Sequence, residues 1–304
     1  MPNFDFVDKR KIFITISVVL IVISGILLFT KGLNLGVDFT GGVEVGIVLN
    51  NPDLSVGDIR DKLSAENGEF EAARIVKQRP LSSEEQGKNS RFSITLSTER
   101  SGDEIESEII QALSGEGATE DSVLSVNNIS GYAAQEISGY AFTAVIVAIA
   151  IILLYITIRF KFSFGVGAIL AVAHDIIITL GFYSLFGMEF NAPVIAALLT
   201  LLGYSLNDTI VVYDRVRENM KRMRGQTIEK VVNDSINQVI VRSLNTSLTT
   251  FIVILCLFIF SGEVLRPFAF GMLVGVVVGT YSSLYIAAPI VIGWFKKSEE
   301  KKKR

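Results

Sequence analysis

Ionisable residues inside long apolar stretches are the strongest candidates for chemistry in this sequence. Asp175 lies within one such stretch, beside His174. Asp208 follows Asn207 in the next stretch, and Arg242 opens the one after it. A charged group at membrane depth is costly, so each is a functional candidate by default. Two carboxylates and one guanidinium group therefore carry the first hypotheses.

Asp208 and Arg242 should fall at similar depth, because the stretches that hold them would cross a membrane in opposite directions. A guanidinium group that approaches or leaves a carboxyl group changes its proton affinity. We therefore expect a relay in which Asp208 exchanges its proton while Arg242 moves, with Asn207 beside it. The alternative is a buried ion pair that only fixes helix packing.

Asp175 has a simpler alternative role. It could bond Thr179 one helical turn later or a hydroxyl group of another segment. His174 projects about 100° away from Asp175 on a helix, so we expect a satisfied buried or interfacial histidine. Asp175 is nevertheless retained as a candidate member of the ion relay.

Two aspartates on neighbouring segments also permit an intramembrane aspartyl protease, in which paired carboxyl groups share a proton. The stretch that ends in Asp208 reads SLND and lacks the glycine beside the aspartate that is typical of that class. With one histidine and one cysteine in the chain, the usual zinc ligand sets are missing. We predict no catalytic set, no metal site, no cofactor, no ATP-binding P-loop and no nucleic-acid-binding module.

The elements that position these residues are six apolar stretches of membrane-spanning length. Hydrophobic residues make up 50% of the 304-residue chain. Such stretches predict an integral membrane protein of six transmembrane helices. A signal peptide is the rival interpretation of the first stretch, but no Ala-x-Ala site follows it, which favours a retained anchor. The expected spans are residues 12–30, 140–158, 164–186, 192–213, 245–260 and 268–295.

Lysine and arginine residues cluster in alternate connections, which predicts the orientation. They gather in residues 1–11, between the second and third spans, in a basic loop at residues 214–244, and in the tail at 296–304. Both termini should therefore be cytoplasmic. The basic face also suits anionic membrane lipids.

Residues 31–139 should form one acidic extracytoplasmic domain, with 19 acidic and nine basic side chains. Its patterns predict strands at 43–49, 72–79, 91–97 and 122–129 and helices at 55–66 and 102–114, with Ser55 capping the first helix opposite Asp58. Residues 80–90 should be an exposed hairpin connection. The order βαββαβ is that of an α+β ferredoxin-like domain, and it contains no set of catalytic groups.

Two groups of glycines suggest close backbone approach. Gly36, Asp38, Gly41 and Gly42 belong to the stretch GVDFTGG, which enters the domain directly after the first span. Changing the glycine pair should disturb the attachment of the domain. In the sixth span, the small-residue face for helix packing consists of Gly271, Gly275 and Gly279.

The GVDFTGG stretch resembles the GxDFxGG signature of the SecF family, auxiliary subunits of the bacterial protein translocase. Residues 198–219, the NTSLTT stretch at 245–250 and the glycine-spaced sixth span resemble later motifs of the same family. The resemblance implies half of a resistance-nodulation-division (RND) type membrane architecture. By that resemblance, the proton-pathway carboxylate of the family corresponds to Asp208 and its arginine to Arg242.

The resemblance also implies a location in the bacterial inner membrane, a function and partners. A SecD subunit would supply the second six-helix half, and the pair would use the proton or sodium motive force to assist SecYEG- and SecA-mediated export of preproteins. YajC and YidC are further expected partners. A small-molecule or lipid exporter of the same superfamily is the alternative, although such exporters usually carry two six-helix repeats in one chain.

Overall fold

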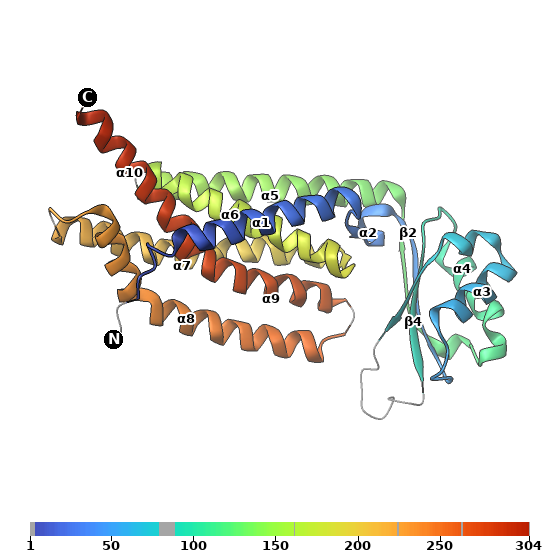
Figure 1. Cartoon of the computed structure of the whole chain (residues 1–304). Helices are drawn as coiled ribbons and strands as arrows, with labels where there is room; N and C mark the ends of the chain where they lie inside the picture. Colours follow the sequence, from blue (N-terminus) through green and yellow to red (C-terminus); the bar gives the residue numbers. More distant parts are fainter. Residues whose placement is uncertain (1–3, 79–88, 161, 224, 263, 304) are drawn as a thin grey trace. The chain divides into compact units, whose positions relative to one another are not determined.

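The chain forms two compact units in the computed structural model, which describes residues 4–78, 89–160, 162–223, 225–262 and 264–303. One is a helical unit, Met1–Asn34 with Thr143–Arg304, and the other is a mixed α/β unit, Leu35–Phe142. Figure 1 shows the elements of both.

Among the residues that the structure describes, six helical segments are long and apolar enough to cross a membrane, as the sequence predicts. The last segment contains a π-helical turn, η4, between two α-helices. The segments are α1 (Arg10–Thr30), α5 (Gly131–Arg159), α6 (Phe162–Phe186), α7 (Ala192–Arg222), α8 (Ile228–Phe260), and α9 (Leu265–Ser282) followed by η4 (Ser283–Ala287) and α10 (Ala288–Lys303).

The structure corrects the prediction of a basic loop at residues 214–244. Helix α7 continues to Arg222 and α8 begins at Ile228, so most of the segment is helical. Thr227 caps α8 through its side chain, and Val231, Val232 and Ile236 bury an apolar stripe at helical spacing. The polar composition marked an exposed surface, and it did not mark a loop.

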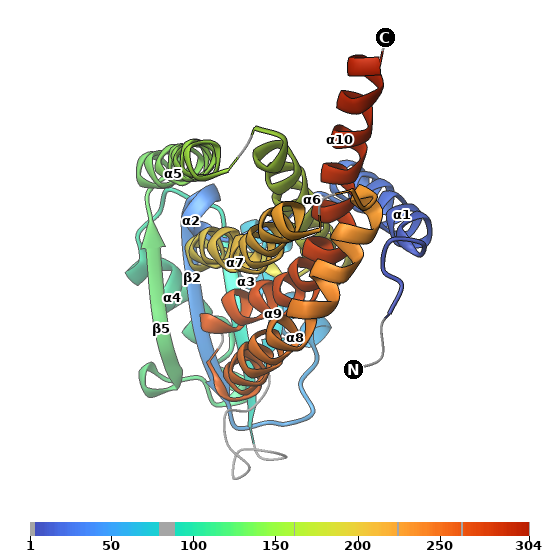
Figure 2. The ribbon, with the colours of Figure 1, turned by 90° about the vertical axis from the view of Figure 1, so that its left-hand side faces the viewer.

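The interior of the helical unit consists of α6, α7 and the last segment. The buried share of their most apolar windows is 61%, 50% and 67%, against 11%, 6% and 11% for α1, α5 and α8. Helix α9 packs against α6, α7 and α8, while α1 packs against α6 (Figure 2). The polar candidates on α6 and α7 are therefore held in the most buried part of the unit.

Gly271, Gly275 and Gly279 line the side of α9 that meets α6 and α7. A Cβ atom on Gly271 would collide with the Tyr183 hydroxyl group, and one on Gly275 with the Leu201 side chain. The missing side chains allow these helices to approach closely.

The α/β unit contains a four-stranded antiparallel sheet in the order β3-β4-β2-β5. The elements expected from the sequence are present, with ends that differ by at most two residues, and the expected connection at residues 80–90 lies largely outside the described residues. The elements are β2 (Gly42–Leu49), α3 (Val56–Glu66), β3 (Arg74–Gln78), β4 (Ser90–Leu96), α4 (Gly102–Ala112) and β5 (Val123–Ile129). The shorter ones are α2 (Val37–Thr40), η1 (Gly68–Ala72), η2 (Ser114–Glu116) and η3 (Glu120–Ser122). Outside this sheet, the chain has two strands of two residues each, β1 (Asn34–Leu35) and β6 (Glu189–Phe190).

The core of the α/β unit lies between the sheet and its two longer helices. Alternate apolar residues of β2, such as Val45 and Ile47, are fully buried with Ile59 of α3 and Ile105 of α4. Ser55 caps α3 in a reciprocal capping box with Asp58, as predicted.

The glycine pair enters β2 through backbone conformations that other residues rarely adopt. Gly41 has φ +70° and Gly42 has φ +122°. A Cβ atom on Gly41 would lie 2.9 Å from the Gly131 Cα atom, and one on Gly42 would overlap the Leu96 carbonyl oxygen. Gly36 is the N-cap residue of α2, and Asp38 lies in its first turn.

Candidate functional site: two buried carboxylates

Asp175 is fully buried at the centre of a hydroxyl cluster. Its Oδ2 atom accepts hydrogen bonds from Ser205 of α7 at 2.5 Å and from Ser282 of α9 at 3.0 Å. Thr179 donates instead to the backbone carbonyl of Asp175, at 2.7 Å. The carboxylate therefore joins three helices, through hydroxyl groups of other segments rather than through Thr179.

His174 belongs to the same cluster. Its Nδ1 atom lies 2.8 Å from Asp175 Oδ1, and its Nε2 atom lies 2.8 Å from the Tyr281 hydroxyl oxygen. Tyr281 in turn lies 3.2 Å from the Ser17 hydroxyl oxygen on α1. His174 is buried and satisfied, as expected, but the expectation that it points away from Asp175 is wrong. Rotation about the side-chain bonds brings the His174 ring to the Asp175 carboxylate, although neighbouring positions on a helix are about 100° apart.

Asp208 lies in a second hydroxyl cluster, formed with α8. Its Oδ2 atom accepts from Ser243 at 2.7 Å and from Ser247 at 3.2 Å. The Ser247 hydroxyl oxygen lies 2.8 Å from that of Thr280 on α9. Asp208 is buried, so these hydroxyl groups supply the hydrogen bonds that an isolated carboxylate would lack.

The buried ion pair between Asp208 and Arg242, the alternative to the relay, is not formed in the structure: no nitrogen of the guanidinium group lies within 4 Å of the carboxylate. Arg242 is exposed, one position before the buried Ser243 that faces Asp208. Neighbouring positions on a helix are about 100° apart, so α8 presents a hydroxyl group where the sequence suggested a cation. Asn207 is also exposed and lies outside both clusters.

Small residues around η4 leave room for these polar groups. A Cβ atom on Gly279 would lie 3.1 Å from that of Ser205 and 3.5 Å from Asp175 Oδ2. The first residue of the π-helical turn, Ser283, lies 2.9 Å from Thr209 through its hydroxyl oxygen. Such turns often occur at functional sites.

Sequence reasoning missed most of the hydroxyl partners. Ser247 lies within the NTSLTT stretch at 245–250, which resembles a family motif. Thr246 and Thr249 of that stretch bond carbonyl groups of their own helix, at 3.1 and 3.0 Å. A serine spaced one turn from another, as at 243 and 247, was the available signal. The residues missed are Ser17, Ser205, Ser243, Thr280, Tyr281 and Ser282.

Asp175 and Asp208 occupy separate clusters and share no hydrogen-bond partner. An aspartyl protease needs two carboxyl groups that share one proton, so this geometry does not support a protease dyad. Within the residues that the structure describes, no group of three metal-ligating side chains occurs either.

Comparison with known proteins decides the family. The sequence profile described as "Protein export membrane protein SecD/SecF, C-terminal" matches residues 109–297, and that of the "SecD/SecF GG Motif" matches residues 26–52. The protein translocase subunit SecF of Petrotoga mobilis is 52% identical over 306 residues, covering 100% of both chains. This chain belongs to the SecF family. The SecF of Calditerrivibrio nitroreducens is 41% identical, over 95% of this chain and 93% of its own.

SecF relatives are named protein translocase subunits, so this chain is a transport component and not an enzyme. Its six apolar helices and its family indicate a multi-pass protein of the cytoplasmic membrane with a role in protein export. The crystal structure of SecDF from Thermus thermophilus superposes with a TM-score of 0.84 at 38% identity. That match covers 97% of this chain and 39% of the longer SecDF chain.

Proposed function

We propose that this chain acts with SecD to couple the proton or sodium motive force to preprotein export through SecYEG and SecA. The observation that carries the proposal is Asp208, a carboxylate buried between α7 and α8 that accepts hydrogen bonds from the hydroxyl groups of Ser243 and Ser247. Ionisable groups at membrane depth typically mark ion pathways. No P-loop occurs in the sequence, so a gradient is the remaining energy source.

The relay would work by exchange of partners at Asp208. In the present arrangement Ser243 and Ser247 bond its carboxylate, and Arg242 lies exposed at the adjacent position of α8. A rotation of α8 by about 100° would replace Ser243 by Arg242 at this face. The neighbours of Asp208 would then alternate between hydroxyl donors and a cation. Its carboxylate would bind a proton or a sodium ion with a different affinity in each of these two states. Asn207 would enter the relay only after a comparable rotation of α7.

Asp175 would support the same movement. Its cluster ties α6, α7 and α9 together, and His174 extends the cluster to α1 through Tyr281. A change of protonation there would loosen or tighten three helix contacts at once. We propose Asp175 as a second station of the relay, with the Gly271–Gly279 face of α9 as the surface on which the helices slide.

The requirement for SecD is supported by the length of the relatives. SecDF of Thermus thermophilus is 38% identical, yet the match covers only 39% of that protein. A SecD subunit would supply the rest and complete an RND-type pair. The structure of SecDF in a super-membrane-facing form also matches, with a TM-score of 0.71 over 100% of this chain and 40% of its own.

The α/β unit would handle the preprotein on the far side of the membrane, with both termini in the cytoplasm. Its strand order and antiparallel pairing support a ferredoxin-like arrangement. The distribution of lysine and arginine supports the orientation. YajC, YidC and membrane lipids are further proposed partners.

The test is Asp208→Asn in vesicles that contain SecYEG, SecA and SecD. We expect ATP-driven translocation to persist and the added effect of an imposed proton or sodium gradient to be lost. Asp214→Asn is the matched control, because Asp214 lies on the same helix, is exposed and pairs with Arg159. A proton gradient and a sodium gradient, imposed in separate experiments, would identify the coupling ion. Normal gradient-driven export by Asp208→Asn would refute the relay.

A further inference from the structure

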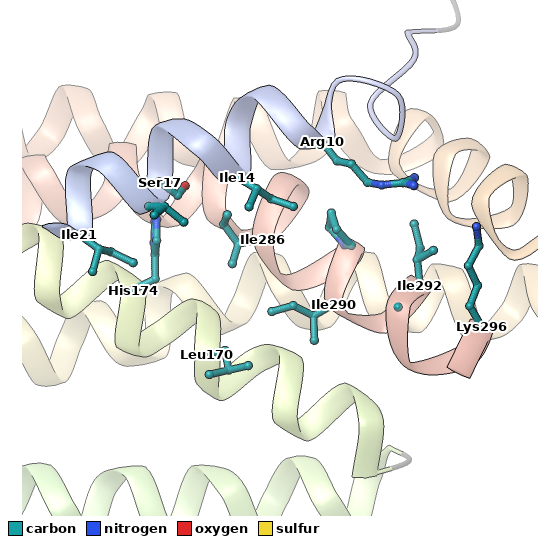
Figure 3. A pocket seen from close by; sticks show the side chains of 13 residues that line it. Arg10, Ile14, Ser17, Ile21, Leu170, His174, Ile286, Ile290, Ile292 and Lys296 are labelled. Atoms are coloured by element: carbon teal, nitrogen blue, oxygen red, sulfur yellow. The ribbon is translucent and has the colours of Figure 1, made fainter. Parts of the chain in front are cut away.

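An apolar groove of about 420 Å³ opens between α1, α6 and the last helical segment. Five isoleucines from α1, η4 and α10 contribute to its apolar wall (Figure 3). Arg10 and Lys296 lie at one end of the groove, while Ser17 and His174 lie toward the other (Figure 3). The lining residues are Arg10, Ile14, Ser17, Val18, Ile21, Leu170, His174, Ile286, Pro289, Ile290, Ile292, Gly293 and Lys296.

The charged end of the groove lies where lipid headgroups would be. Arg10 is the first residue of α1, and Lys296 is near the end of the last membrane-spanning segment, Leu265–Lys297. Basic side chains at the ends of such segments reach the interfacial layer. The isoleucine-lined part runs from this layer along the helices toward the middle of the bilayer.

The charges at this end are unbalanced. Lys296 pairs with Glu229 of α8, whereas Arg10 forms no ion pair with any residue that the structure describes. Two cations and one carboxylate leave a net charge of +1. Arginine presents a planar fork of donors that matches phosphate oxygens.

We propose that this groove binds one anionic phospholipid, with its phosphodiester between Arg10 and Lys296 and one acyl chain along Ile14, Ile286 and Ile290. The lipid supplies the negative charge that the mouth lacks, and its chain covers the isoleucines. An apolar helix of a second subunit would cover the same wall but would leave the net charge of +1 at the mouth unbalanced. The acyl chain would also keep water from the edge of the His174–Asp175 pair.

The test is native mass spectrometry of the full chain in detergent, titrated with phosphatidylglycerol or with phosphatidylcholine. We expect one tightly held phosphatidylglycerol and much weaker retention of phosphatidylcholine. A cation that lies against the headgroup of an anionic lipid contributes about five-fold in affinity. Arg10→Gln with Lys296→Gln should therefore weaken retention by about 25-fold.

Matched variants separate this site from general basicity. Lys11→Gln with Lys297→Gln removes the same charge at adjacent positions outside the groove and should leave retention unchanged. Gly293→Leu keeps every charge and fills the groove, since a Cβ atom on Gly293 meets no atom within 4 Å. It should also release the lipid, while near-native thermal stability would show that the bundle is intact.

Three results would overturn the proposal. The first is equal retention of phosphatidylglycerol and phosphatidylcholine by the native chain, or retention of phosphatidylglycerol by the Arg10→Gln/Lys296→Gln and Gly293→Leu variants at the native level. The second is displacement by inorganic phosphate alone, which would make the site one for a free anion. The third is loss of the lipid on adding SecD, with a crosslink from SecD to Ile14→Cys in a Cys256→Ser background, which would identify a protein helix as the occupant.

Discussion

Gly42→Ala should unfold the α/β unit at a clearly lower urea concentration than the native sequence. Gly42 has φ +122°, a conformation that costs a residue with a Cβ atom about 1–3 kcal/mol. The new Cβ atom would also overlap the carbonyl oxygen of Leu96, a backbone atom. Leu96 is paired with Val43 in the sheet, so it cannot move without disturbing the junction of β2 and β4.

The size of the effect follows from these two costs. Forced overpacking typically adds about 1–3 kcal/mol, so the free energy of unfolding should fall by about 4 kcal/mol in total. Urea lowers that free energy by about 1–3 kcal/mol per molar for small domains. The midpoint should therefore drop by about 2 M.

Pulse proteolysis of the full chain in detergent and urea would measure this, because cleavage sites in the α/β unit become accessible when it unfolds. Gly115→Ala is the matched control: its φ is not positive and its Cβ atom would meet nothing within 4 Å. That variant should stay within about 0.5 kcal/mol of the native chain. A Gly42→Ala midpoint no lower than that of Gly115→Ala would refute the steric account of the glycine pair.

Three other outcomes test the packing and electrostatics. Gly271→Ala should destabilise the helical unit by about 1–3 kcal/mol in detergent melting, because it displaces the buried Tyr183 hydroxyl group; adding Tyr183→Phe should recover part of the loss, and full additivity would contradict the contact. Arg100 bonds Glu108 and holds its pKa below the ordinary 4.5, so this pair stabilises above that pH and the effect disappears as the pH falls. Arg100→Gln should thus lower the urea midpoint at pH 7, and its curve should converge with the native one in acid; a constant gap would argue against the pair. Ser55→Ala should cost the α/β unit about 1 kcal/mol by removing the cap of α3, and an unchanged midpoint would show that the cap is redundant.

Local patterns in the sequence determined most of the secondary structure. Runs of apolar residues predicted six membrane helices, and alternation predicted the strands at 72–79 and 91–97, because burial repeats with the period of the element itself. The capping box of Ser55 and Asp58 spans only three residues and was equally readable. The glycine pair at Gly41 and Gly42 marked an unusual backbone, although the sequence could not show that Leu96 and Gly131 were the atoms approached.

Tertiary structure decided what the buried carboxylates touch. Asp208 meets Ser243 and not Arg242 because the rotation of α8 about its axis is set by packing along its whole length, and one residue of rotation exchanges a cation for a hydroxyl group. His174 reaches Asp175 through side-chain torsions, which a helical wheel does not contain. Sequence therefore identified which residues are costly to bury, whereas only the packing of helices far apart in the chain selected the partners that make their burial tolerable.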